Sequence, residues 1–179
     1  MKWVVKTFEE LSIHELYHIL RLRSAVFVVE QQSIYLDPDG KDYWSTNDPA
    51  LIGAFMTSLK YGFESHNFYG WDREIHSGCM KDGSLLAYAR LLPDEADENK
   101  VWLGRIIAVQ RGCGYGRMLV GKGLELAKKQ LHANSVWLEA QVQAQPFYEK
   151  MGFAQVGSTY WLDGILHVNM CKNLAETEM

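Results

Sequence analysis

The segment 101–131 limits the fold of this chain more than any other, because a strand, a glycine-rich loop and a helix follow one another without a gap. Residues 101–109 are mostly apolar, as in a buried strand. RGCGYG follows at once, and apolar residues then recur at helical spacing from Val120 to Leu131. Backbone N–H groups at the start of such a helix lack partners within it and point toward an anion. The segment therefore predicts an α/β fold with a cradle for phosphate.

Basic residues are concentrated in the same segment. Six of them and a single acid lie between Val101 and His132, whereas the whole chain carries a net charge of −4. The loop lacks the Lys-Ser/Thr ending of a P-loop and the downstream acid of a dinucleotide fold, which argues against nucleoside triphosphates and NAD. The net negative charge argues against a nucleic-acid surface. A tight turn without a ligand remains the alternative for the glycines.

Length and composition predict one domain over residues 1–179. The chain is 47% hydrophobic, enough for one core, and no repeat or linker divides it. Its apolar runs fall far short of the roughly 20 residues of a membrane span, and acids at Glu9 and Glu10 argue against a signal peptide. The three cysteines and six histidines show no disulfide or metal spacing. We therefore expect a cytoplasmic protein that binds no metal and no membrane.

Local signals predict further helices and strands around the central segment. Ser12 and Glu15 form a capping box that starts a helix at Ile13. Asp48 and Pro49 are typical of a helix start and predict a helix over 49–61. The other predicted elements are strands at 2–8, 84–92, 101–109 and 136–140, helices at 115–131 and 145–151, and hairpin turns at Asp82-Gly83 and Asp163-Gly164.

Two motifs resemble signatures of the GNAT superfamily of N-acetyltransferases. In RIIAVQRGCGYGRMLVGKGLELA, Arg111, Gly114 and Gly116 occupy the R/Q-x-x-G-x-G/A positions of the acyl-CoA-binding signature. QVQAQPFYEKMGF is similar to the N-x-x-A-x-x-F-Y-E-K-x-G-F segment, with Gln141 in place of the usual Asn. LRLRSAVFVVEQ, DPDGKD, LAYARLL and WLGRIIAV resemble the ElaA-like branch. The resemblance covers the chain except for about 43–75, which we interpret as an atypical insertion.

The resemblance implies a mixed, mostly antiparallel central sheet flanked by helices. Its fourth and fifth strands, here 102–109 and 136–140, would splay apart to admit the pantetheine arm of acetyl-CoA, the co-substrate. The implied reaction is transfer of acetyl to a primary amine of a small molecule or protein. The implied CoA contacts are main-chain groups of Ile106, Ile107, Ala108 and Val109, the loop Arg111, Gly112, Cys113, Gly114, Tyr115, Gly116 and Arg117, and the side chains of Gln141 and Phe147.

Acyl transfer from a thioester to an amine needs a neutral amine and a proton for the departing thiolate. Tyr148 occupies the position at which the family uses a tyrosine, so the resemblance implies that it is the acid. Packing of its ring against Phe147 and Phe153 is the alternative.

The sequence does not identify a single residue as the general base. Many members of the family carry a Glu on the fourth strand, where this sequence offers only Arg105. Glu30 follows an apolar run, and a carboxylate beside an apolar cleft has a raised pKa, so Glu30 is the first candidate. A water chain, Glu139 and His76 are the alternatives. An acyl-CoA sensor without turnover, and an enzyme like acyl-homoserine-lactone synthases, are the other functions to consider.

Eight aromatic residues lie between Tyr43 and Trp71. They favour equally an acceptor pocket with its lid, an added part of the core, or the contact surface of a homodimer. Nearby acids would attract a cationic amine or serve as ordinary turn residues. These acids are Asp37, Asp39, Asp42 and Asp48.

Overall fold

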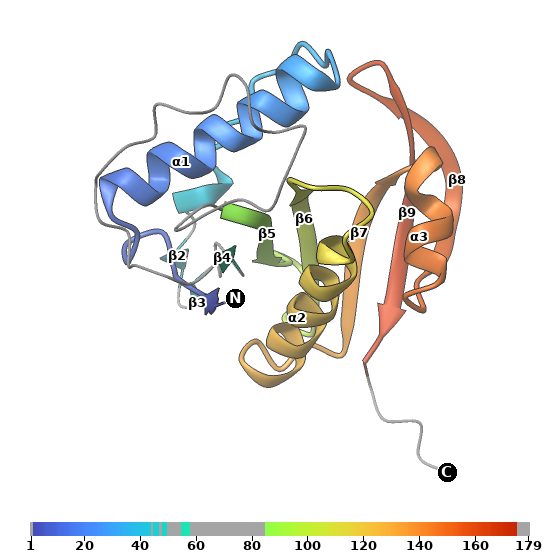
Figure 1. The fold of residues 1–179 in the computed structure, drawn as a ribbon. Coiled ribbons are helices and arrows are strands. Elements are labelled where there is room, and N and C mark those ends of the chain that lie inside the picture. The colour runs from blue at the N-terminus through green and yellow to red at the C-terminus, as the bar shows by residue number, and fades with distance from the viewer. Residues whose placement is uncertain (1, 44, 47, 50–54, 58–84, 175–179) are drawn as a thin grey trace.

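The computed structural model describes residues 2–43, 45–46, 48–49, 55–57 and 85–174 (Figure 1). A seven-stranded sheet runs through them, and only its β6–β7 pair is parallel. The predicted mixed, mostly antiparallel sheet is therefore confirmed. In spatial order its strands are β1 (Lys2–Val4), β4 (Phe55–Thr57), β5 (Leu85–Pro93), β6 (Lys100–Ala108), β7 (Ser135–Gln141), β9 (Ile165–Asn173) and β8 (Ala154–Leu162). A separate ribbon pairs β2 (Ser45–Thr46) with β3 (Asp48–Pro49).

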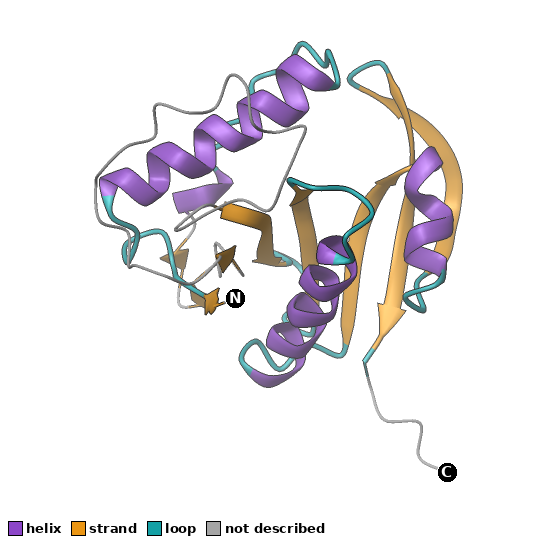
Figure 2. Cartoon of the chain, viewed as in Figure 1, coloured by secondary structure: helices purple, strands orange, loops and turns teal. Residues whose placement is uncertain are grey.

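The first helix begins where the capping box predicts. Ser12 Oγ accepts a hydrogen bond from the Glu15 amide, and the Glu15 carboxylate accepts one from the Ser12 amide. The helical segments are α1 (Ile13–Arg23), the π-helical η1 (Ser24–Glu30), the 3₁₀ turns η2 (Lys41–Tyr43) and η3 (Val142–Ala144), α2 (Tyr115–Lys129) and α3 (Gln145–Glu149). None of the helices in the described ranges is long and apolar enough to cross a bilayer. Figure 2 shows α3 beside the β8–β9 hairpin, at the end of the sheet away from α1.

Helices α1 and α2 cover opposite faces of the sheet. Alternate residues of a strand point to opposite faces, and β5 divides its side chains in this way. Ala87, Ala89 and Leu91 belong to the core cluster that contains the α2 residues Leu119 and Val120. Tyr88 belongs to a second cluster with the α1 residues Ile19 and Leu22. We refer below to the α2 face and the α1 face of the sheet.

Strands β6 and β7 separate partway along their length. Their parallel pairing joins Lys100–Trp102 to Ser135–Trp137 and extends no further in the register. Just beyond it, Arg105 and Ile106 together lie opposite the single residue Ala89 of β5, which makes a β-bulge, and Arg105 has a φ of 54°. Bulges bend a strand and redirect its side chains. The predicted splay of these two strands is therefore confirmed, and the bulge accompanies it.

The predicted helix over 49–61 is wrong. Pro49 closes the short strand β3, and Phe55–Thr57 forms β4, which pairs with β1 on one side and β5 on the other. Tertiary pairing overrides the local capping signal, because β4 satisfies the backbone groups of two neighbouring strands at once. Most of the proposed insertion at 43–75 lies outside the described residues, as do the Asp82-Gly83 turn, His76 and Cys79. The Asp163-Gly164 hairpin is confirmed between β8 and β9.

Candidate active site

The glycine-rich loop lies at the start of α2. Gly114 is the N-cap residue, and both it and Gly112 have a positive φ, at 80° and 79°. No side chain of the described residues caps the helix. A β-carbon at Gly116 would lie 3.5 Å from Phe147 Cζ, so the loop passes close to α3. The two segments that carry the resemblance thus come together, with the first amide groups of α2 open to an anion.

Glu30 lies beside this loop. Its carboxylate forms an ion pair with Arg111, and the two side chains are 51% and 76% exposed. Glu30 is not among the residues that line the large cleft described next. The half-exposed carboxylate is thus outside the cleft in which a base would act, and its pairing with Arg111 would compete with an anionic ligand of the loop.

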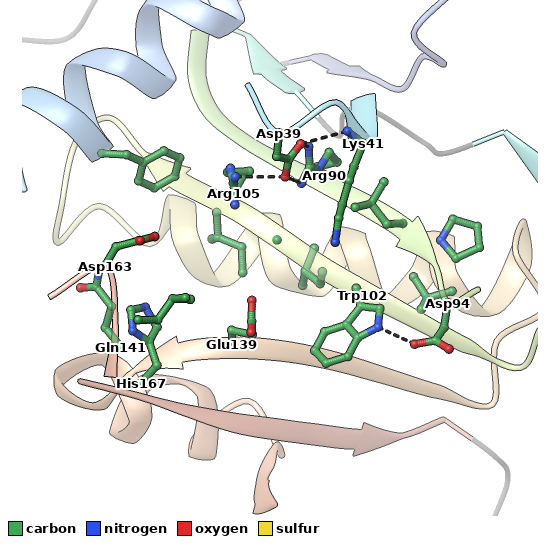
Figure 3. A pocket seen from close by; sticks show the side chains of 18 of the residues that line it. Asp39, Lys41, Arg90, Asp94, Trp102, Arg105, Glu139, Gln141, Asp163 and His167 are labelled. Atoms are coloured by element: carbon green, nitrogen blue, oxygen red, sulfur yellow. Dashed lines mark hydrogen bonds and ion pairs between the residues drawn. The ribbon is translucent and has the colours of Figure 1, made fainter. Parts of the chain in front are cut away.

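A cleft of about 1610 Å³ opens beside the separated part of β6 and β7. Arg90, Arg105 and Asp39 lie on one wall, and Glu139 and His167 lie on the other (Figure 3). Gln141, Ile106 and Tyr148 also line it. The cleft therefore combines charged groups from two separate walls with the tyrosine that the sequence singles out.

The loop and the polar walls of the cleft belong to opposite faces of the sheet. On β7, Leu138 and Ala140 are buried in the α2-face core, so Glu139 and Gln141 point to the α1 face. A β-carbon at Gly116 would lie 3.9 Å from Ala108 Cβ, so the loop is on the α2 face. Between these faces, the pairing register of β6 and β7 ends at Trp102 and Trp137. Gln141 donates a hydrogen bond to Gln31 Oε1 at 3.0 Å on the α1 face.

Tyr148 reaches the cleft from α3. Its ring packs edge-on against Phe147 and Phe153, with centroids 5.0 and 6.0 Å away. Burial raises the pKa of its phenol to about 12, so the proton is retained at neutral pH. Within the described ranges its hydroxyl has no hydrogen-bond partner. The structure is thus compatible with both interpretations of Tyr148. Its ring packs in the core, and its hydroxyl is available to donate a proton.

Three arginines and three aspartates form a network under the charged wall. Arg23 Nε lies 2.7 Å from Asp37 Oδ2, and its Nη1 donates to both oxygens of Asp42 at 3.0 Å. Arg90 bridges Asp42 and Asp39, at 2.7 Å to each. Arg105 Nε lies 2.9 Å from Asp37 Oδ1, and its Nη2 lies 3.1 Å from Asp39 Oδ2. Asp37 and Asp42 are buried in these ion pairs and do not face an incoming amine.

Acid is expected to destabilise the fold through Asp39. Burial alone would raise the pKa of its carboxyl, but Arg90 and Arg105 hold that pKa well below its usual range. The carboxylate therefore stabilises the folded state above about pH 4, where the unfolded chain also ionises, and the effect is lost as the pH falls. Asp39→Asn should lower the free energy of unfolding at pH 7 by about 1.5 to 3 kcal/mol.

Urea unfolding across a series of pH values measures both the loss at neutral pH and the acid slope. Glu9→Gln, which changes an exposed acid, is the control and should leave both unchanged. An Asp39→Asn variant with the wild-type acid slope would contradict the prediction.

The opposite wall is made by one face of β7, β9 and β8. The register pairs Gln141 with His167 and His167 with Tyr160, so the three share that face. The Tyr160 hydroxyl lies 2.9 Å from both Glu139 Oε1 and Asn169 Oδ1. Sequence reasoning missed His167 and Tyr160 as site residues. The Asp163-Gly164 turn contained the signal, because counting three residues outward from it on each strand pairs Tyr160 with His167.

Potential metal ligands are not gathered in this structure. Across residues 2–43, 45–46, 48–49, 55–57 and 85–174, no three His, Cys, Asp or Glu side chains are placed to hold a metal ion. Cys113 is free and exposed within the loop, and Cys171 is free on β9.

Comparisons with known proteins agree with this geometry. Residues 74–174 match a family model described as an acetyltransferase (GNAT) domain. Protein ElaA of Escherichia coli K12 is 34% identical over 178 residues, which cover 98% of this chain and 99% of ElaA. The crystal structure of E. coli ElaA superposes with a TM-score of 0.72, covering 96% of this chain and 99% of that one at 32% identity. An acyl-CoA N-acyltransferase from Pseudomonas aeruginosa gives 0.71 at 30% identity, with the same coverage.

Proposed function

The chain belongs to the GNAT acetyltransferase family, and on that premise we propose that it transfers an acetyl group from acetyl-CoA to a primary amine. One observation carries the proposal. The pairing of β6 with β7 ends between the glycine-rich loop on the α2 face and the polar cleft on the α1 face. A pantetheine arm inserted between the two strands would let its thioester carbonyl meet a nucleophile that arrives from the other side of the sheet.

We assign the CoA contacts to the loop and to the unpaired edge of β6. The amide groups from Gly112 to Gly116, with Arg111 and Arg117, would bind the pyrophosphate. Main-chain groups of Ile106–Val109 would pair with the pantetheine amides, because among the described residues β6 has no strand partner on its β7 side beyond Trp102. Phe147 and Gln141 would flank the arm. In the free protein Arg111 is paired with Glu30, so CoA binding would have to displace that carboxylate.

Tyr148 would act as the acid. As the amine nitrogen forms a bond to the thioester carbonyl carbon, the C–S bond breaks and its electron pair leaves on sulfur. The phenolic proton of Tyr148 then passes to that sulfur, giving free CoA thiol. A phenol that keeps its proton at neutral pH and has an unoccupied hydroxyl supports this role.

The charge of the cleft favours a cationic acceptor. Only three basic side chains, Lys41, Arg90 and Arg105, line it among the residues that the structure describes. The lining carboxylates are Asp39, Asp94, Glu95, Asp97, Glu98, Glu139 and Asp163. This excess of negative charge would attract a substrate with more than one ammonium group. We therefore propose that 1,4-diaminobutane is acetylated faster than n-butylamine, which has the same chain and a single amine.

Calorimetric titration with acetyl-CoA, followed by an assay of thiol release with these two amines, tests the proposal. We expect a dissociation constant in the micromolar range and thiol release that depends on the amine. An absence of acetyl-CoA binding would overturn the assignment of the cradle. Binding without turnover of any amine in a wider panel would favour the acyl-CoA sensor.

A further inference from the structure

His167 is held in one tautomer by its own strand. Its Nδ1 lies 2.9 Å from the carbonyl oxygen of Ile165. A carbonyl oxygen can only accept a hydrogen bond, so in the neutral ring Nδ1 carries the proton and donates it. The basic lone pair is therefore on Nε2, on the other side of the ring. Within the described ranges, no side chain or backbone group hydrogen-bonds to Nε2.

The ring is also placed on the correct side of the sheet for an acceptor. In the register of β7 and β9, His167 lies opposite Gln141, whose side chain points to the α1 face. The His167 ring lines the cleft on that face. The cradle lies on the α2 face, so the amine and the base would share one face while the thioester enters from the other. Figure 3 shows His167 and Glu139 on the wall opposite Arg105 and Asp39.

Resting on the acetyl-transfer function proposed above, we propose that His167 is the general base that accepts a proton from the acceptor amine at Nε2. A neutral amine attacks the thioester carbonyl carbon, a C–N bond forms and the C–S bond breaks. The proton released by the new amide nitrogen goes to His167 Nε2, while Tyr148 protonates the sulfur. The imidazolium and the phenolate then return to their neutral forms by proton exchange with water.

The groups around His167 come from several neighbouring elements. Tyr160 on β8 stacks on it, with ring centroids 6.3 Å apart and an angle of 27°. Glu139 on β7 accepts a hydrogen bond from that same Tyr160 hydroxyl, which places a carboxylate next to the stack. Asp163 in the hairpin turn and Tyr148 on α3 line the same cleft, and Arg105 is on the opposite wall. The groups that face His167 are therefore Tyr160 and the Glu139 carboxylate bound to it, with Asp163 and Tyr148 in the same cleft and Arg105 across it.

Glu139 is a weaker candidate for the base itself. Its Oε1 already accepts the Tyr160 hydrogen bond, and its side chain is exposed. Glu30 is paired with Arg111 and is not among the residues that line the cleft. Among these groups only His167 combines a fixed tautomer, an unoccupied basic atom and a place in the cleft.

The test compares His167→Gln with His14→Gln, which changes an exposed histidine on α1. With acetyl-CoA and 1,4-diaminobutane, we expect His167→Gln to lose about 10²- to 10⁴-fold in kcat. The wild type should show an acidic limb in kcat/KM that His167→Gln lacks and that Glu139→Gln and Glu30→Gln retain. Acetyl-CoA affinity should be unchanged, and thermal unfolding should confirm that the variant is folded.

The ¹⁵N shifts of the His167 ring provide a readout that needs no turnover. We expect the Nδ1–H tautomer in the free wild-type protein, and the Nε2–H tautomer would overturn the proposal. An active wild type whose His167→Gln variant keeps its rate and its acidic limb would also overturn it. A wild type that acetylates no amine would instead overturn the proposed function, so the two failures are distinguishable.

Discussion

Tyr148→Phe should lose about 10²- to 10⁴-fold in kcat while its affinity for acetyl-CoA stays within about twofold of the wild type. The substitution removes a hydroxyl and keeps the ring, so the edge-on packing against Phe147 and Phe153 is preserved. Since the hydroxyl has no hydrogen-bond partner among the described residues, its removal should leave the stability almost unchanged. Steady-state kinetics and calorimetry on the same preparation measure the two effects.

Tyr35 offers a matched control in the same cleft. Burial also raises the pKa of its phenol to about 12, but its hydroxyl donates to Asp37 Oδ1 at 3.1 Å and is therefore occupied. Tyr35→Phe should retain kcat within about threefold and lose stability on the order of 1 kcal/mol. Equal rates for Tyr148→Phe and the wild type would remove the acid role. Burial raises the pKa of both phenols to about 12, so the difference that the structure shows between the two tyrosines is the availability of the hydroxyl.

Gly114→Glu should weaken acetyl-CoA binding by at least about 100-fold, the effect of losing two hydrogen bonds to a charged group. Gly114 is the N-cap of α2, where a carboxylate would occupy the space in front of the free amide groups and repel a pyrophosphate. A β-carbon at this position meets no atom within 4 Å, so the new side chain does not disturb the core. Calorimetry measures the loss, and circular dichroism verifies the fold.

Gly114→Ala separates charge from backbone strain. The φ of 80° is unfavourable for any residue with a β-carbon, so both variants carry the same strain of about 1 to 2 kcal/mol. Gly114→Ala should therefore resemble Gly114→Glu in stability and the wild type in CoA affinity. If Gly114→Glu binds acetyl-CoA normally, the cradle is not where the anion lies.

Local signals predicted the parts of the fold that depend on neighbouring residues. The capping box at Ser12 and the Asp163-Gly164 turn act over three or four residues, and both are confirmed. The helix over 49–61 was wrong because β4 is determined by β1 and β5, which are distant in sequence. The π-helical geometry of η1 and the bulge at Arg105 also depend on packing that no periodicity encodes.

The site divides in the same way. The motifs pointed to the glycine-rich loop and to Tyr148, because each motif is a continuous run of residues. The residues that line the cleft could not be predicted so directly, since they come from separate elements that include η1, β5, β6, β7 and β9. Glu30 follows an apolar run, yet its side chain is exposed. The run belongs to the π-helical segment η1, which ends at Glu30, and Glu30 pairs there with Arg111 of the glycine-rich loop. The position of His167 beside the site follows only from the strand register, which places it opposite Gln141.

Alternation along β7 would allow the acceptor site to change without altering the core that supports the cradle. Leu138 and Ala140 are buried in the core on the α2 face, whereas Glu139 lines the cleft on the α1 face. A relative could therefore exchange the residue at position 139 without disturbing that core, whereas Gln141 would also flank the proposed CoA arm. Within a lineage, CoA recognition would then stay fixed while acceptor choice drifts, and position 139 would be the first place to look for a change of substrate.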